Sequence, residues 1–205
     1  MVGKAIIQDL SEKFEVSAVD VDEKALQFCN DQYGVETIYK YLNNPQNIKE
    51  VVTDADYVVS AVPGFMGYNT LEAVIESGKD VVDISFMPED FMQLDEKAKQ
   101  NDVTAIADCG VAPGMPNIIL GYHSHEMQVE YFEYMVGGLP KERKFPYEYK
   151  APFSPIDVLE EYFRPARVKE HGKLITKPAM RDAEMVYFRN IGHREAVNID
   201  GLRCM

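Results

Sequence analysis

The stretch that decides the fold runs from Tyr57 to Asn117, where two apolar runs each end in a loop rich in glycine and proline. The first loop is Ser60-Ala61-Val62-Pro63-Gly64, and the second is Asp108-Cys109-Gly110-Val111-Ala112-Pro113-Gly114. Open α/β sheets use such loops, at the carboxyl ends of their strands, to bring the backbone close to a ligand. The stretch therefore predicts an open α/β sheet with a ligand site at the strand ends.

Strand and helix patterns alternate through the first hundred residues. The expected strands cover 15–20, 35–39, 57–62, 80–84 and 103–107, and the expected helices cover 2–14, 23–33, 47–52, 69–77 and 89–100. Such alternation requires a parallel sheet with crossover helices. The run at 57–62 is almost continuously apolar, as in strands that are buried on both faces. These patterns predict an α/β fold with a Rossmann-like, mostly parallel sheet.

The pattern changes near Gly110. Helices are expected at 115–126 and 156–162, and alternating residues at 129–136, 184–188 and 194–198 predict strands of an antiparallel sheet with one wet face. We therefore expect two domains, a Rossmann-like domain over residues 1–110 and an α+β domain over residues 111–205.

Composition and charge exclude several classes of partner. The net charge of −13 would repel a nucleic-acid backbone. No apolar run is long enough to span a membrane, and the first residues do not resemble a secretory signal. The three cysteines, Cys29, Cys109 and Cys204, have no C-x-x-C spacing, which argues against a disulfide framework and a metal site. We expect a soluble cytoplasmic protein with reduced thiols, no metal, no nucleic acid and no membrane partner.

Two residues near the start suggest a dinucleotide site. Gly3 stands where the third glycine of a G-x-G-x-x-G turn permits tight packing of helix on strand, and Asp20 ends the following strand. A carboxylate there accepts hydrogen bonds from an adenosine ribose and repels a 2′-phosphate, which favours NAD, with NADP possible. The alternative is that Gly3 only allows close packing and that Asp20 caps the next helix, a role for which Asp22 competes.

The loop after the third expected strand lies where a nicotinamide ribose would pass. Ser60, Ala61, Val62 and Pro63 are therefore candidate cofactor contacts. The same proline and glycine content also suits an ordinary turn between a strand and a helix.

Two aspartates end successive strands at the edge where ligands collect. Asp83 and Asp108 could orient an amine or take a proton from it. The alternative is that one caps a loop and the other pairs with a lysine.

Two arginines near a helix end are candidates for holding a carboxylate. Arg164 and Arg167 have the planar fork that suits an α-carboxylate, and the alternative is an ion pair with Glu160 or Glu161.

Five segments, in order, resemble the saccharopine dehydrogenase family, and most closely its lysine 6-dehydrogenase-like branch. The resemblance covers nearly the whole chain. The segments are Val82-Asp83-Ile84-Ser85-Phe86-Met87-Pro88-Glu89-Asp90, Asp108-Cys109-Gly110-Val111-Ala112-Pro113-Gly114-Met115-Pro116-Asn117, Gly137-Gly138-Leu139-Pro140, Glu161-Tyr162-Phe163-Arg164-Pro165-Ala166 and Asp200-Gly201-Leu202-Arg203.

The resemblance implies an NAD(P)-dependent oxidoreductase that oxidises an amino acid at a carbon bearing nitrogen. In the lysine branch the side-chain amine of L-lysine becomes an imine. The first domain would bind the dinucleotide, and the second would bind the substrate and form a homodimer. Asp108 and Asp83 are then the catalytic candidates, Arg164, Arg167 and Tyr162 would bind substrate, and Ser85 joins the cofactor contacts.

The resemblance also predicts that the chain lacks the first Rossmann strand with its two leading glycines, and that relatives continue beyond Met205. The rival enzyme hypothesis is a saccharopine or carboxynorspermidine dehydrogenase or reductase. A hypothesis from another class is a catalytically silent dimerisation or binding fragment.

Overall fold

The structure is a computed structural model, and it describes residues 2–146, 148–151 and 153–200. The chain divides into two compact units, Met1–Ala107 (unit 1) and Asp108–Met205 (unit 2). The predicted division after residue 110 lies close to this boundary.

Unit 1 alternates helices and strands in the predicted order. Its elements are α1 (Val2–Leu10), β1 (Ser17–Asp20), α2 (Glu23–Tyr33), β2 (Glu36–Tyr39), α3 (Pro45–Val52), β3 (Tyr57–Ser60), α4 (Gly64–Glu76), β4 (Asp80–Asp83), the 3-10 helix η1 (Phe91–Leu94), α5 (Asp95–Gln100) and β5 (Ala105–Ile106).

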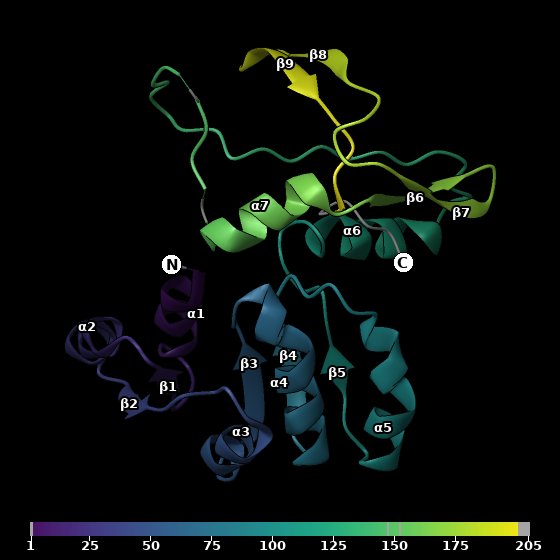
Figure 1. The fold of residues 1–205 in the computed structure, drawn as a ribbon. Coiled ribbons are helices and arrows are strands. Elements are labelled where there is room, and N and C mark those ends of the chain that lie inside the picture. The colour runs from purple at the N-terminus through teal and green to yellow at the C-terminus, as the bar shows by residue number, and fades with distance from the viewer. Residues whose placement is uncertain (1, 147, 152, 201–205) are drawn as a thin grey trace. The chain divides into compact units, whose positions relative to one another are not determined.

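The strands of unit 1 are parallel and form two sheets. β1 pairs with β2, and β3, β4 and β5 form a second sheet in that order, so consecutive strands are joined by crossover helices (Figure 1). The predicted α/β class with a parallel, Rossmann-like sheet is confirmed.

Two apolar cores hold unit 1 together. The larger packs α3, α4 and the η1–α5 segment onto Val58, Val81 and Ala105 of the second sheet, and the smaller joins α1 and α2 to β1. The prediction that the 57–62 run is buried on both faces is wrong, because Tyr57 is 75% exposed and Val59 is 42% exposed. Helices of unit 1 cover one face of this strand, so its alternate side chains face away from the core.

Two helix boundaries differ from the predictions. α4 begins at Gly64 rather than at 69, directly after Pro63, whose backbone conformation suits the residue before a helix. The predicted helix at 89–100 is two pieces, because Asp90 accepts a hydrogen bond from Met92 N at 3.0 Å and starts a separate 3-10 turn.

Unit 2 contains two helices and two isolated hairpins among its described residues. They are α6 (Met115–Ser124), α7 (Pro155–Phe163), the antiparallel pair β6 (Ala166–Glu170) and β7 (Lys173–Lys177), and the antiparallel pair β8 (Glu184–Phe188) and β9 (Gly192–Ala196).

The predicted strand at 129–136 is wrong, and the β6–β7 hairpin was not predicted. Residues 129–136 alternate in sequence, but no described segment pairs with them, and alternation without a partner makes no ladder. The hairpin turns at His171 and Gly172, both with positive φ, which is the two-residue turn that matches strand twist. β9 also begins two residues before its predicted start at Arg194.

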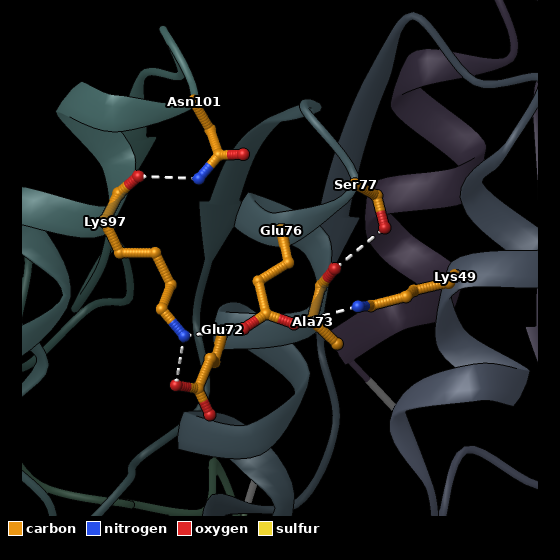
Figure 2. Close-up of polar contacts among 7 residues, drawn as sticks. All are labelled: Lys49, Glu72, Ala73, Glu76, Ser77, Lys97 and Asn101. Carbon is orange, nitrogen blue, oxygen red and sulfur yellow. Dashed lines mark hydrogen bonds and ion pairs between the residues drawn. The ribbon is translucent and has the colours of Figure 1, made fainter.

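Ion pairs link three helices of unit 1 at the surface of the larger core. Lys97 Nζ lies 2.6 Å from both Glu72 Oε1 and Glu76 Oε1, and Lys49 Nζ lies 2.8 Å from Glu76 Oε2 (Figure 2). The Lys49 hydrogen bond, followed by that of Lys97, lowers the pKa of Glu76 to about 2. Glu76 thereby ties α4 to both α3 and α5.

Glu76→Gln is expected to destabilise the protein at neutral pH and to have a smaller effect at pH 3. Folding lowers the pKa of Glu76 from its ordinary 4.5 to about 2, so its stabilising contribution is complete above pH 4.5 and is lost as the pH falls toward 2. Since these side chains are about one-third exposed, we expect a loss of about 1 kcal/mol at pH 7. Chemical unfolding at pH 7 and pH 3 measures it.

The matched control is Glu50→Gln, which removes an ion pair between Lys40 and Glu50 on α3 that links no second helix. An equal loss of stability in both variants would contradict a special role of Glu76.

Candidate functional site

The carboxyl ends of β3 and β4 lie side by side and form the candidate site of unit 1. Ser60 and Asp83 are paired in the parallel register, and Ile84 N donates a hydrogen bond to Ser60 O at 3.0 Å. The following loop residues differ in exposure, since Ala61 is exposed and Val62 and Pro63 are half-buried. The predicted loop therefore emerges at the strand edge where open α/β sheets bind ligands.

Asp83 lies inside the protein rather than at the surface of this edge. Its side chain is fully buried, and its Oδ1 accepts hydrogen bonds from Ser85 N at 2.8 Å and from Ser85 Oγ at 2.5 Å. A buried carboxylate needs such donors, because desolvation without them is costly. In this geometry Asp83 organises the loop after β4 and positions Ser85, which matches the alternative role as a loop cap.

α4 approaches this loop closely at Gly67. A Cβ at that position would lie 2.2 Å from Ser85 Oγ and 3.0 Å from the Cβ atoms of Ser85 and Met87. Glycine at 67 therefore lets the helix pack directly on the Asp83–Ser85 hydrogen bonds. Ser60 Oγ and Thr70 Oγ1, on β3 and α4, are buried and have no hydrogen-bond partner among the residues that the structure describes.

Gly67→Ala is expected to destabilise the protein by about 1 to 3 kcal/mol, because the new methyl group displaces Ser85 and strains the packing of α4. Thermal or chemical unfolding of the full chain measures the change.

Gly3→Ala is the matched control, since it also changes a helical glycine but meets no atom within 4 Å. Alanine favours a helix over glycine by up to about 1 kcal/mol, so Gly3→Ala should be neutral or stabilising. Equal losses in the two variants would refute the steric explanation.

A second cluster of polar groups lies where β1 and β2 end. Asp20 is exposed and faces Tyr39 in the parallel register, and its Oδ1 accepts hydrogen bonds from Val21 N at 2.6 Å and Asp22 N at 3.0 Å. Asp22 is the cap of α2, accepting hydrogen bonds from Lys24 N and Ala25 N. The proposed capping role therefore belongs to Asp22, and Asp20 instead holds the turn before the helix.

An open hollow adjoins these residues. It is lined by Val21, Asp22, Glu23, Lys24 and Tyr39. The Tyr39 ring is 48% exposed and its hydroxyl donates a hydrogen bond to that of Tyr41 at 3.2 Å. The hollow thus places the partly exposed Tyr39 among the side chains of Asp22, Glu23 and Lys24.

The close packing expected at Gly3 is not present among the described residues. Nothing lies within 4 Å of a Cβ built there, and no side chain of α1 is fully buried, although Ile7 packs against the smaller core. The physical reason is that no described strand packs against the first turn of α1. A cofactor contact of Gly3 stays a prediction.

In unit 2 the residues from Asp108 to Gly114 fold into a compact loop that leads into the first turn of α6. Gly110 N donates to Pro113 O at 3.1 Å, Met115 N donates to Gly110 O at 2.9 Å, and Gly114 N donates to Asn117 Oδ1 at 3.2 Å. Gly114 has a φ of 137°, and a Cβ there would lie 2.2 Å from Gly110 O. Asp108, which also has a positive φ, opens this loop.

The two predicted anchor arginines both make ion pairs. Arg164 Nε donates to Glu160 Oε2 at 3.0 Å, which is one of the alternatives considered from sequence. Arg167 donates to both carboxylate oxygens of Asp200, at 3.1 and 3.3 Å, and Asp200 is only 3% exposed. The guanidinium fork of Arg167 is therefore used within unit 2.

Near Arg164 lies a buried acidic pair that the sequence analysis did not identify as functional. Asp157 and Glu161 are 6% and 9% exposed and lie one turn apart on α7. Burial raises the pKa of Glu161 to about 7, and the Asp157 carboxylate adds to this while Arg164 opposes it. No hydrogen bond to the Glu161 carboxyl is found within the described part of the chain.

Tyrosines border this pair. Burial raises the pKa of Tyr149 to about 12, and Tyr162 and Glu161 add to the shift. Tyr162, a predicted substrate contact, is thus placed beside Glu161 and Tyr149. The signal that sequence offered was an Asp-x-x-x-Glu spacing on a helix, which also occurs on ordinary solvated faces.

Glu161→Gln is expected to stabilise the protein at pH 8 by about 2 kcal/mol and to change little at pH 4. Folding raises the pKa of Glu161 from 4.5 to about 7, so the native state loses stability as the pH rises from 4.5 through 7 and the buried group ionises. Unfolding measured across this pH range tests the effect.

Glu160→Gln is the control, because Glu160 is the exposed neighbour that pairs with Arg164. It should lower stability slightly at pH 8 or leave it unchanged. A gain in both variants would indicate a general charge effect.

The described residues contain neither a metal-binding cluster nor a membrane-spanning helix. No group of three or more histidine, cysteine, aspartate or glutamate side chains is arranged to hold a metal ion. No helix there is long and apolar enough to cross a membrane. Cys29 and Cys109 are free thiols, and Cys204 lies outside the described residues.

Unit 1 has the architecture of a Rossmann-type nucleotide-binding domain, with parallel strands, crossover helices and polar loops at the carboxyl edge. Residues 1–106 match the saccharopine dehydrogenase NADP binding domain, and residues 110–204 match the saccharopine dehydrogenase C-terminal domain. The chain belongs to the saccharopine dehydrogenase family, a family of NAD(P)-dependent oxidoreductases.

Several individual proteins are similar. The α-aminoadipic semialdehyde synthase of Arabidopsis thaliana is 26% identical over 148 residues, which cover 69% of this chain and 14% of that protein. The saccharopine dehydrogenase [NADP(+), L-glutamate-forming] of Pyricularia oryzae is 25% identical over 156 residues, covering 72% of this chain and 35% of that protein.

A solved structure shares the fold. Apo saccharopine dehydrogenase (L-Glu forming) from Saccharomyces cerevisiae matches with a TM-score of 0.68 and 19% identity, over 93% of this chain and 46% of that chain. This chain thus spans less than half the length of each of these three proteins.

Proposed function

We propose that this protein is an NAD(P)-dependent oxidoreductase that acts on a carbon–nitrogen bond of an amino acid. The observation that carries the proposal is the match of two consecutive family domains in order, over residues 1–106 and 110–204. A Rossmann-type sheet whose loops emerge at one strand edge supports the assignment of the first domain to the dinucleotide.

The relatives favour saccharopine as the substrate, because one of them is named a saccharopine dehydrogenase. Oxidation of the L-lysine side-chain amine, as in a lysine 6-dehydrogenase, is the second candidate, favoured by the sequence motifs. Both reactions remove a hydride from a carbon bonded to nitrogen and a proton from that nitrogen. Carboxynorspermidine and a catalytically silent binding role remain rival proposals.

A bound dinucleotide would supply the hydride acceptor. The contacts with the cofactor would come from Ser60, Ala61, Val62, Pro63 and Ser85. Asp108 would take or return the nitrogen proton, and Arg164 would hold a substrate carboxylate with help from Tyr162. Asp83 would act by positioning Ser85, since its carboxylate is wholly buried.

The full chain, supplied with NAD or NADP, is expected to form reduced dinucleotide with saccharopine and to do so faster than with L-lysine. Absorbance of the reduced nicotinamide measures the rate. Turnover of lysine alone would establish the second candidate, and turnover of neither substrate with either dinucleotide would contradict the proposal.

Arg164→Ala tests the assignment of Arg164 to the substrate carboxylate. It is expected to raise KM for the amino acid much more than KM for the dinucleotide, because the guanidinium is assigned to the substrate carboxylate. Arg167→Ala is a poor probe of binding, since Arg167 is engaged with the buried Asp200.

We also propose that the protein forms a homodimer through unit 2. α7 buries Asp157 and Glu161 but leaves Ile156, Leu159 and Phe163 exposed, and a second copy would cover this apolar stripe. Light scattering of the full chain tests it. The cytoplasmic location and the lack of a nucleic-acid partner stay predictions from composition.

A further inference from the structure

The buried face of α7 carries charged groups of both signs. Asp157, Glu161 and Arg164 are spaced by four and three residues, so they follow one another along one side of the helix, with Arg164 directly after its last residue. Asp157 and Glu161 are 6% and 9% exposed, and the side chain of Arg164 is 13% exposed. We call these three residues the polar stripe. The inward face of a helix is ordinarily apolar, so the stripe calls for a specific reason.

A tyrosine from the preceding loop borders the polar stripe. Tyr149 lies close to Tyr162 and Glu161, and both groups raise its pKa further after burial has done so. Gly138, from the Gly-Gly-Leu-Pro family segment, packs against this tyrosine: Lys150 N donates to Gly138 O at 3.0 Å, and a Cβ at 138 would lie 2.9 Å from Cε2 of the Tyr149 ring. Because Tyr149 is still 37% exposed, solvent reaches the border of the stripe.

The Glu161 carboxyl is buried without a hydrogen-bond donor from any residue that the structure describes. The charged and titratable groups that face it are Asp157 and Arg164 of the stripe and the hydroxyl of Tyr149, with Tyr162 beside it. Burial and the Asp157 charge raise its pKa to about 7, although Arg164 acts in the opposite direction. A buried carboxylate is stabilised by a cation that donates hydrogen bonds, and Glu161 therefore suits a cationic ligand group.

An α-amino acid carries the two charges that complement this stripe. Its ammonium and its carboxylate are attached to the same carbon, so the two groups cannot be far apart. In the proposed function Arg164 holds a substrate carboxylate, and Glu161 precedes Arg164 by one helical turn. A carboxylate on the guanidinium would therefore bring the adjoining ammonium toward the Glu161 carboxyl, where the charge of Asp157 adds to the attraction.

We propose that Glu161 binds the α-ammonium group of the amino-acid substrate, so that unit 2 selects compounds whose amine and carboxylate share one carbon. Glu161 is then a specificity residue and takes no part in the transfer of the hydride. The proposal rests on the proposed function, in which Arg164 holds the carboxylate, and it adds the residue that recognises the neighbouring amine. A Glu161 carboxyl that is protonated before binding would release its proton to the solvent as the ammonium arrives.

Calorimetric titration of the full chain with two matched pairs of compounds tests the proposal. L-Lysine is compared with 6-aminohexanoate, which lacks only the α-amine, and L-saccharopine is compared with the same compound acetylated at its primary amine. In at least one pair the free α-amine should tighten binding by about tenfold or more. Equal binding within each pair, or binding of none of the four compounds, would overturn the proposal. Reduction of the dinucleotide, assayed separately with saccharopine and lysine, still decides the proposed function.

Glu161→Gln is the decisive variant, because glutamine keeps the size of the side chain and removes its charge. It should reduce the preference for the free α-amine to about threefold or less, and it should leave the binding of 6-aminohexanoate unchanged. Glu161→Asp keeps the charge and should retain part of the preference, which provides a second reading if Glu161→Gln folds poorly. A full preference in Glu161→Gln, or none in Glu161→Asp, would overturn the proposal.

Glu170→Gln is the control, since Glu170 is a carboxylate of unit 2 that pairs with Lys177 on the β6–β7 hairpin. Its preference should equal that of the parent. Titrations at pH 6.5 in two buffers of different ionisation enthalpy add a second measurement. At this pH, below the raised pKa of about 7, most of Glu161 is protonated, so the parent and Glu170→Gln should release protons on binding and Glu161→Gln should not. Absence of proton release in the parent would overturn the proposal.

Discussion

The structure of the candidate site in unit 1 depends on the hydrogen bonds to one buried carboxyl group, that of Asp83. The Asp83 carboxylate has no access to water, so the hydrogen bonds from Ser85 N and Oγ take the place of solvent. These hydrogen bonds turn the chain back directly after β4. Because Gly67 has no side chain, α4 packs directly against this loop. The position of α4 in turn fixes the loop that leaves β3, because α4 begins directly after that loop.

Charge is distributed unevenly between the units, and this bears on their proposed roles. Unit 1 carries nearly all of the net negative charge, whereas residues 108–205 carry thirteen lysines and arginines against fourteen aspartates and glutamates. A dinucleotide already has two backbone phosphates, so an acidic unit binds it through backbone amides and ribose contacts rather than through a basic surface. Unit 2 contains the arginines, and their guanidinium groups suit the binding of an amino-acid carboxylate.

In unit 2, helix α7 buries polar side chains where an ordinary amphipathic helix buries apolar ones. α7 buries an acidic pair and a valine while its leucine and phenylalanine face outward. Burial is the main physical reason for the raised pKa of Glu161, and the charge of Asp157, one turn away, adds to the shift. Such a group changes charge near neutral pH and lies beside two tyrosines and the proposed anchor arginine.

Local pattern was sufficient for much of this protein. The alternating strands and helices of residues 1–107 and the candidate cap at Asp22 follow from the spacing of neighbouring residues, because helix periodicity and capping act within a few positions of the chain.

The remaining features of the structure depend on packing between residues that are distant in sequence. It turned Asp83 inward, engaged Arg167 with Asp200, buried Glu161 and left the 129–136 segment without a strand partner. Burial, strand pairing and ion pairs between residues distant in sequence, such as Arg167 and Asp200, arise between groups that meet only after folding, so no spacing along the chain could reveal them.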